Sequence, residues 1–240
     1  MRRLFYKGKL EDFIRIEGAD AHHLKNVYRA KIGDEITVVD DFNAAGRMEI
    51  VEFLENAVLL KLIEKIPLIG DAKTKLTLAT AVLKGEKTEL VLQKATELGV
   101  FEISPIMTER VVVKFDDKKR AEKLRRWEKI TSEAAKQSGG LPPKVSPVTD
   151  LNDFLRQNKN PLIFFYENEQ KTSLKDALKN IKSDNISLLI GPEGGFSPYE
   201  AENIINAGGI TATLGKRILR AETAAITAVA LTMYERGELQ

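Results

Sequence analysis

The stretch that decides the fold is LLIGPEGGFSP, residues 188–198, together with a second stretch, LGKRILRAETA, at residues 214–224. Each starts as a short apolar run typical of a buried strand and continues into a loop rich in glycine or charge. Each loop ends where a helix is expected to start. In an open α/β sheet, ligands bind outside the carboxyl ends of the strands. Two such loops near each other in sequence therefore predict one ligand site with two walls.

The first loop has the composition of a loop that lets a ligand approach the backbone. Gly191, Gly194 and Gly195 stand within it, and glycine both accepts positive φ and keeps side-chain atoms out of the way. Ser197 followed by Pro198 predicts an N-cap and the first position of a helix. The alternative is a tight strand-to-helix turn that binds nothing. The presence of the second loop favours the ligand site.

Neither loop has the spacing of two common nucleotide sites. The glycines of the first loop do not follow the Gly-x-Gly-x-x-Gly pattern of dinucleotide-binding proteins. Gly209 and Gly215 are one residue too far apart for a phosphate-binding loop, and Arg217 stands where that motif needs serine or threonine. A nicotinamide dinucleotide or a nucleoside triphosphate is therefore not the first ligand to expect.

The composition of the 240-residue chain limits the class of protein. No apolar run approaches the roughly 20 residues of a membrane span, so we expect no membrane partner. The chain contains no cysteine, which excludes disulfides and cysteine-bound zinc. Its two histidines, His22 and His23, are adjacent and cannot form a helical metal pair, so we expect no metal. With a basic N-terminus that lacks the apolar core of a signal peptide, these features predict a cytoplasmic protein.

The charge is small in total but uneven along the chain. The net charge is +2, whereas residues 1–31 carry eight Lys and Arg against four Asp and Glu, and residues 109–129 carry nine against five. Segregation of this kind indicates a surface that binds a polyanion such as RNA. Two solvated helix or strand faces are the alternative explanation.

The pattern of apolar residues divides the chain near residues 67–72, which have the composition of a linker. Before it, short strands at 14–16, 35–39, 47–53 and 57–63 predict a small barrel, with a helix at 19–28 that Asp20 caps and that buries one of the two histidines. After it, strands alternate with helices, which predicts a parallel sheet covered on both faces. The expected strands are 76–83, 101–106, 162–166, 186–190 and 211–214, and the expected helices are 87–98, 117–138, 174–181, 198–207 and 222–235.

The two loops resemble the signature of the RsmE family, 16S ribosomal RNA uridine-N3 methyltransferases of the SPOUT superfamily. The likeness extends to QKATELGV at 93–100, EAAKQS at 133–138, MRRLF at 1–5 and His22-His23-Leu24, and so covers nearly the whole chain. It implies a PUA-like RNA-binding β-barrel at 1–70 and a SPOUT-type α/β domain, a parallel sheet with a C-terminal trefoil knot, at 73–240. True knots are almost absent from proteins, so the knot is expected on the resemblance alone. The resemblance also implies S-adenosylmethionine (SAM) as cofactor, a homodimer, and 16S rRNA or the small ribosomal subunit as partner.

The residues of the two loops and of one strand end are the expected cofactor site. Apolar side chains would form its walls, and main-chain groups of the loops would pair with the adenine and ribose edges. Glu193 is expected either to meet a ribose hydroxyl or to cap its own loop. The full set is Thr80, Ile190, Gly191, Glu193, Gly194, Gly195, Leu214, Ile218, Leu219, Arg220 and Ala224.

Arg220 and Glu222 are the candidate catalytic residues. Methyl transfer needs alignment of donor and acceptor more than acid–base chemistry. Uracil N3, however, carries a proton that it must lose. Arg220 cannot act as a base, but it can stabilise the developing uracil anion. Glu222 can accept the proton, although a first-turn acid that complements the helix dipole is the favoured interpretation.

The candidate RNA-binding residues are Arg2, Arg3, His23, Arg29, Lys84 and Lys94. Arg3, His23 and Arg29 resemble positions of the family that face RNA. Lys84, Lys87 and Lys94 follow a strand end and can hold phosphates, or form a solvated helix face. The family usually has a basic residue near Gly140, which this chain lacks; Lys136 or Lys144 is the candidate replacement.

Three alternatives stay open on the sequence. A SPOUT enzyme of this kind can act on transfer RNA or on another ribosomal site. A non-catalytic RNA-binding assembly factor would keep the fold without the chemistry. A metabolic enzyme that uses another nucleotide is disfavoured by the two basic stretches. The sequence does not specify the modified nucleotide, or whether the substrate is naked RNA or an assembled subunit.

Overall fold

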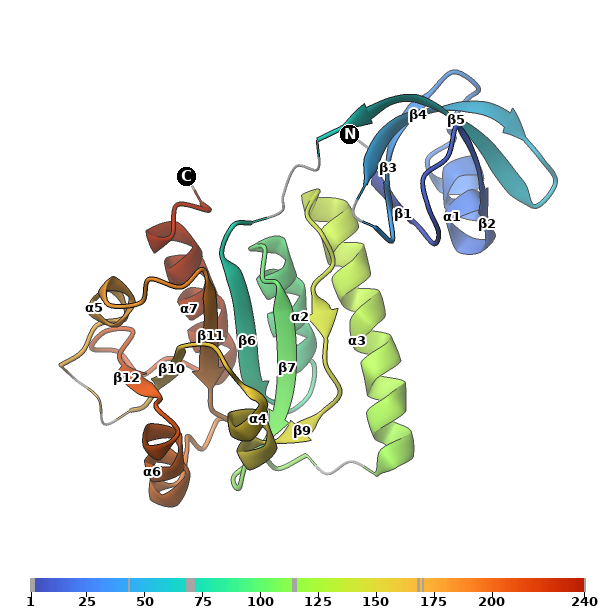
Figure 1. Cartoon of the computed structure of the whole chain (residues 1–240). Helices are drawn as coiled ribbons and strands as arrows, with labels where there is room; N and C mark the ends of the chain where they lie inside the picture. The colour runs from blue at the N-terminus through green and yellow to red at the C-terminus, as the bar shows by residue number, and fades with distance from the viewer. Residues whose placement is uncertain are drawn as a thin grey trace. The chain divides into compact units, whose positions relative to one another are not determined.

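The computed structural model describes residues 3–42, 44–67, 72–113, 116–167, 169 and 171–239. The chain divides into two compact units, Met1–Asp71 and Ala72–Gln240 (Figure 1). Arg2, one of the candidate RNA-binding residues, lies outside the described residues.

The first unit is a curled sheet in the order β1–β3–β4–β5–β2. Its strands are β1 (Arg3–Tyr6), β2 (Phe13–Glu17), β3 (Glu35–Asp40), β4 (Ala45–Phe53) and β5 (Ala57–Ile66). Register shifts in the β4–β5 pair bend the sheet around a core that includes Ile36, Met48 and Leu60. The expected barrel is therefore realised as a half-barrel, because β1 and β2 end the described strand order instead of pairing with each other.

The helical segment of this unit differs from the prediction of one helix capped by Asp20. It consists of α1 (Gly18–His22) and a wider π-helical turn, η1 (His23–Val27). Helix α1 starts two residues before Asp20, with Glu17 at the N-cap position and no side-chain cap. Leu24 is buried against the sheet, whereas His22 and His23 are both exposed, so the prediction of one buried histidine is wrong.

The second unit is built on a parallel sheet in the order β12–β10–β11–β6–β7–β8, with β9 also beside β7. Its strands are β6 (Lys75–Ala81), β7 (Glu102–Met107), β8 (Lys144–Val145), β9 (Thr149–Asp150), β10 (Leu162–Phe165), β11 (Asn185–Ile190) and β12 (Ile210–Ala212). Strands β6 and β11 are neighbours, and their register sets Ile190 beside Thr80.

Helices cover both faces of this sheet, as the alternation of elements predicted (Figure 1). They are α2 (Lys87–Glu97), α3 (Asp117–Ser138), α4 (Leu151–Gln157), α5 (Leu174–Lys179), α6 (Pro198–Asn206) and α7 (Ala221–Glu235). Leu76 and Leu78 of β6 point to the face that carries α2, α3, α5 and α7. Ala79 and Ala81 point to the other face, against α4 and α6. The short elements β1, β8, β9 and α4 were not predicted.

Glu169 fixes the loop between β10 and α5. Its carboxylate accepts hydrogen bonds from the backbone N–H of Thr172 at 2.9 Å, the hydroxyl of Thr211 at 2.7 Å and the backbone N–H of Lys171 at 2.7 Å. These donors lower the pKa of Glu169 to about 2. Because Thr211 belongs to β12, the carboxylate ties the loop to the edge of the sheet.

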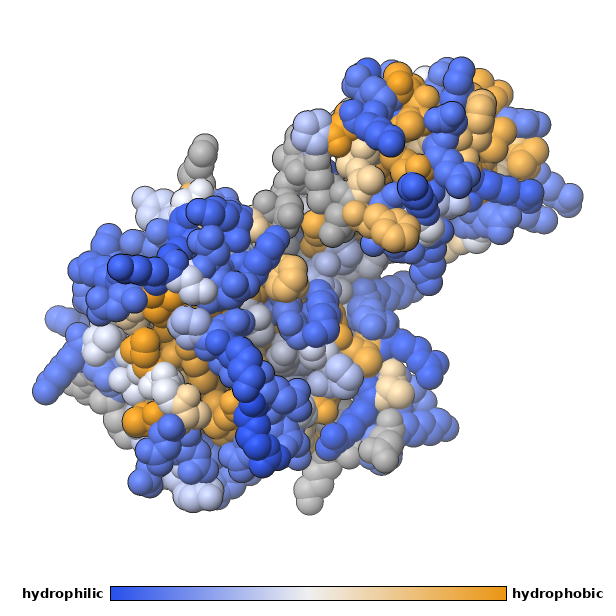
Figure 2. Space-filling view, in the orientation of Figure 1, coloured by the Kyte–Doolittle hydropathy of each residue, from blue (hydrophilic) through white to orange (hydrophobic). Residues whose placement is uncertain are grey.

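Hydrophilic side chains cover most of the visible surface of each unit, with apolar ones in small groups (Figure 2). Within the described part of the chain, no helix has both the length and the apolar character needed to cross a membrane.

Candidate active site

The carboxyl ends of β6 and β11 form the centre of the candidate site. The helix that follows β6, α2, lies on one face of the sheet, and the helix that follows β11, α6, lies on the other. Chain connections that leave adjacent strands for opposite faces open a crevice at the carboxyl edge of the sheet, where α/β proteins bind ligands. Thr80 and Ile190 stand side by side at this edge, and both are buried.

The three glycines of the first loop differ in backbone conformation and in surroundings. Gly195 has φ +66°, a backbone conformation that side chains disfavour. A Cβ atom at Gly191 would meet the ring of Phe196 at 3.1 Å, which is tighter than ordinary contact. A Cβ at Gly194 would meet Arg110 at 3.4 Å. A side chain is therefore disfavoured at Gly195 by its φ and at Gly191 by the Phe196 ring, whereas the contact at Gly194 is at an ordinary distance.

The helix after this loop starts as predicted. Ser197 caps α6: its hydroxyl oxygen accepts a hydrogen bond from the backbone N–H of Glu200 at 3.2 Å. The Glu200 carboxylate in turn accepts a hydrogen bond from the backbone N–H of Ser197 at 2.9 Å. This reciprocal capping box, with Pro198 in the first turn, fixes the direction in which the chain leaves the loop.

Two contacts from the loop after β7 support the first loop, and neither was predicted. The second carboxylate oxygen of Glu200 accepts the N–H of Glu109 at 2.8 Å. The Arg110 guanidinium donates to the carbonyl of Gly194 at 2.7 Å. No motif in the sequence signals either contact, because the partners are 91 and 84 residues apart.

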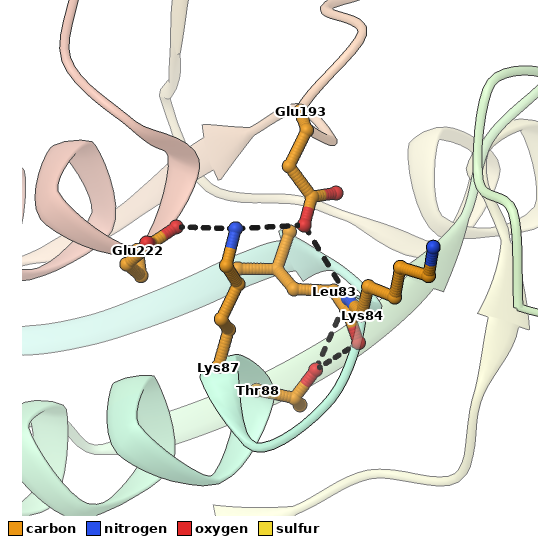
Figure 3. A network of polar contacts seen from close by, with 6 residues as sticks. All are labelled: Leu83, Lys84, Lys87, Thr88, Glu193 and Glu222. Atoms are coloured by element: carbon orange, nitrogen blue, oxygen red, sulfur yellow. Dashed lines mark hydrogen bonds and ion pairs between the residues drawn. The ribbon is translucent and has the colours of Figure 1, made fainter.

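A cluster of charges joins three segments at the crevice (Figure 3). The ammonium of Lys87, at the start of α2, lies 3.3 Å from Oε1 of Glu193 in the first loop and 3.5 Å from Oε2 of Glu222 in α7. The backbone N–H of Lys84 donates to Oε1 of Glu193 at 3.4 Å. The candidate residues Glu193, Lys84 and Glu222 are therefore brought together, with Lys87 between the two acids.

The two acids of this cluster differ in their surroundings. Burial opposes ionisation of Glu193, but hydrogen bonds from its own backbone N–H and from Lys87 and Lys84 outweigh it and lower its pKa. The side chain of Glu222 is only 12% exposed. Its Oε2 makes no hydrogen bond to the described residues and instead forms the ion pair with Lys87.

The second loop is more open than the first. Leu214, Leu219 and Ala224 are half-buried, whereas Ile218, expected in a wall of the site, is 91% exposed. Arg220 occupies the N-cap position of α7 with an exposed side chain.

Comparison with known proteins identifies the family. A model of an RNA methyltransferase domain matches residues 71–233, and a model of an RNA methyltransferase PUA domain matches residues 16–52. The chain is 33% identical to ribosomal RNA small subunit methyltransferase E of Bacillus subtilis, over 92% of this chain and 89% of the relative. It is 36% identical to the protein of the same name from Mesomycoplasma hyopneumoniae, over 94% and 96%. The chain belongs to the RsmE family of RNA methyltransferases.

The fold agrees with a solved RsmE-family structure. The ribosomal RNA small subunit methyltransferase E of Neisseria gonorrhoeae, bound to S-adenosyl methionine, is 28% identical and superposes with a TM-score of 0.88, over 98% of this chain and 97% of that one. The expected family and the expected activity class, RNA methyltransferase, are confirmed.

The described RNA-binding candidates of this RsmE-family chain fall into two groups. Arg3, His23 and Arg29 belong to the first unit. Arg3 lies in β1, where burial lowers its pKa. The ring of His23 stacks on the ring of Tyr28, with the ring centroids 5.5 Å apart. Arg29 is exposed and has a backbone φ of +48°.

The other two candidates, Lys84 and Lys94, belong to the second unit. Lys84 is exposed in the turn after β6. Lys94, on α2, pairs with Glu97 at 2.9 Å. The two lysines considered as replacements near Gly140 also stand in ion pairs, Lys136 with Glu133 at 3.7 Å and Lys144 with Glu102 at 3.0 Å.

Proposed function

We propose that this protein methylates N3 of a specific uridine in 16S ribosomal RNA and takes the methyl group from SAM. The observation that carries the proposal is the meeting of the glycine loop with the start of α7 at the carboxyl edge of a parallel sheet, where Lys87 bridges Glu193 and Glu222. The relatives named ribosomal RNA small subunit methyltransferase E, and the Neisseria gonorrhoeae structure with its bound S-adenosyl methionine, support it.

The residues present fit this cofactor. Gly191, Gly194 and Gly195 carry no side chains, so an adenosine can approach the backbone of the loop closely, and Leu214 and Leu219 offer half-buried apolar surface. When bound, SAM supplies a methyl group on a sulfonium, which is an excellent leaving group. The work left to the chain is to hold the uridine in line and to exclude water.

We assign stabilisation of the uracil anion to Arg220 and acceptance of the N3 proton to Glu222. The N3–H bond of uracil must break before or as the N3–CH₃ bond forms. The exposed guanidinium of Arg220 can donate to an exocyclic oxygen of the uracil and stabilise the negative charge that develops. Glu222, two residues further on, carries a carboxylate that can accept the proton. That carboxylate turns toward Lys87, a contact that a role confined to the helix dipole does not require.

We also propose the finer architecture that the family implies: a trefoil knot in residues 73–240, RNA binding by a PUA-like domain in residues 1–70, and a homodimer. The division of the chain after Asp71 supports the domain bounds. Ala225 and Ala228 of α7 are buried within the unit, but Leu231 and Tyr234 are exposed on the same helix and can contact a second copy. Because its substrate is ribosomal, the proposed compartment is the cytoplasm.

The test is nucleoside mapping of 16S rRNA from cells with and without the gene for this protein. One uridine should carry a methyl group in the first RNA and lack it in the second, and the modified nucleoside should be 3-methyluridine. A product that is 5-methyluridine or a ribose-methylated nucleoside would overturn the assigned chemistry. Loss of a methyl group from transfer RNA instead would favour the alternative substrate.

A further inference from the structure

Lys87 is a charged residue of the site whose role the proposed reaction does not explain. Its ammonium lies between Glu193 of the first loop and Glu222 in the first turn of α7, the helix that follows the second loop (Figure 3). Lys87 itself comes from a third segment, the first turn of α2. A single cation therefore connects three separate chain segments.

The backbone turn that precedes Lys87 is held by hydrogen bonds of its own. The hydroxyl of Thr88 accepts the backbone N–H of Leu83 at 2.8 Å and donates to the carbonyl of Leu83 at 3.2 Å. Thr88 is buried, and its two hydrogen bonds close the turn between β6 and α2. The backbone from which the Lys87 side chain starts is thus held to the sheet by a short, hydrogen-bonded turn.

The ammonium of Lys87 offsets the repulsion between the two carboxylates of Glu193 and Glu222. Both lie within 3.5 Å of the same nitrogen, so their nearest oxygens are no more than about 7 Å apart, which is inside the screening length of physiological salt. Without Lys87 they would repel each other. Glu193 is 38% exposed and can turn toward water, whereas Glu222 is 12% exposed and cannot do so as easily. Repulsion would therefore turn the Glu193 side chain outward and break its hydrogen bond with the backbone N–H of Lys84, which ties the first loop to the turn after β6.

A phosphate contact is the other role open to Lys87. Its charge is already balanced by two carboxylates, and a phosphate at the same nitrogen would add a further negative charge to the cluster. Lys84, whose side chain is exposed in the same turn, is the better placed residue for a phosphate.

We propose that Lys87 is a positioning residue, which holds the glycine loop and the first turn of α7 at the separation that SAM binding requires. The inference rests on the proposed function, because it concerns the geometry of that cofactor site. Lys87 acts through Glu193 and Glu222 and does not itself touch the reacting atoms.

The experiment compares Lys87→Met, which keeps the apolar stem, with Lys87→Arg, which keeps the charge. Lys175→Met is the matched control, because Lys175 pairs with Glu235 at 3.2 Å on the same unit without touching the cluster. Calorimetry should show the Kd for SAM raised about fivefold in Lys87→Met, within about twofold of wild type in Lys87→Arg, and unchanged in the control. Since Lys87 is 35% exposed, Lys87→Met should fold, which circular dichroism checks.

A double-mutant cycle distinguishes positioning from other roles. Glu193→Gln should weaken SAM binding less in the Lys87→Met background than in wild type, because the repulsion it removes exists only there. The salt dependence of RNA binding should be the same in Lys87→Met as in wild type. An unchanged Kd for SAM together with a salt slope reduced by about one would overturn the inference in favour of a phosphate contact. Additive effects in the cycle would also overturn it. Failure of the wild type to bind SAM would refute the proposed function instead.

Discussion

Replacing Gly195 by valine separates ligand binding from folding at the first loop. Gly195 has φ +66°, and a Cβ atom added there would lie 3.7 Å from the Glu167 carboxylate, an ordinary contact distance. The Cβ of valine therefore meets no hard overlap in the folded chain. It does impose a β-branched side chain on a left-handed backbone, beside the loop that SAM must approach closely.

The cost to stability follows from the backbone. A residue other than glycine in the left-handed region loses about 1–2 kcal/mol. In a protein of this size each kcal/mol lowers Tm by about 2–4 °C, so we expect a drop of about 2–8 °C for Gly195→Val. Gly208, at φ +86° with no atom within 4 Å of an added Cβ, is the matched control. Gly208→Val should lose a similar amount of stability.

Calorimetry with SAM then distinguishes the two variants. Gly208→Val should bind SAM like the wild type, and Gly195→Val should bind at least about tenfold more weakly, a difference of about 1.4 kcal/mol. A folded Gly195→Val protein with full affinity would refute the assignment of this loop to the cofactor. Equal loss of affinity in both variants would show that the effect is general destabilisation.

Four further outcomes are expected. Arg220→Ala should keep SAM affinity but lower single-turnover methylation about a hundredfold, and Arg220→Lys should recover only part of it, because a point charge cannot reproduce the planar guanidinium. Arg29→Ala and Lys94→Ala should each weaken RNA binding and reduce its salt slope by about one, measured by titration at several salt concentrations. Light scattering at micromolar protein should give about twice 26.8 kDa, and a monomer mass would contradict the homodimer. The folded pKa of Glu169 lies at about 2, below the usual 4.5, so its ionised carboxylate stabilises the folded state above about pH 4.5, and this stabilisation is lost toward pH 2. Denaturant unfolding at several pH values should show that the stability of Glu169→Gln falls less with acid than that of the wild type.

Local features of the fold could be predicted from the sequence because their causes are local. The N-cap at Ser197, followed by Pro198, depends on a few neighbouring residues, and it stands where the sequence indicated. Asp20 shows the limit of such reasoning: α1 starts at Gly18, two residues before Asp20, and Glu17 takes the N-cap position without a side-chain cap. The half-barrel also escaped prediction, because closure depends on how distant strand edges meet.

The contacts of the site could be predicted only in outline. The strand ends indicated that two loops would share one edge, and the register of Ile190 with Thr80 agrees with that. The supporting contacts of Arg110 and Lys87 join residues 84 and 106 positions from their partners, and no pattern in the sequence specifies such pairs. Ile218, assigned to a wall on hydrophobicity alone, is exposed, because hydrophobicity does not fix the direction of a loop side chain.

The ion pairs of the crevice are better explained by their effect on the separation of the site's walls than by a contribution to folding stability. The side chains of Lys87 and Glu193 are each more than a third exposed, and pairs of this kind contribute between nothing and about 1 kcal/mol to folding. The sheet, with buried apolar side chains on both faces, supplies the stability of the unit without them. At the crevice, adjacent strands send their chains to opposite faces, and Lys87 joins the first loop to the start of α7. Charges that join the loops there cost little in folding and set the separation of the walls. A change of one charge at this edge should therefore alter ligand binding far more than it alters Tm.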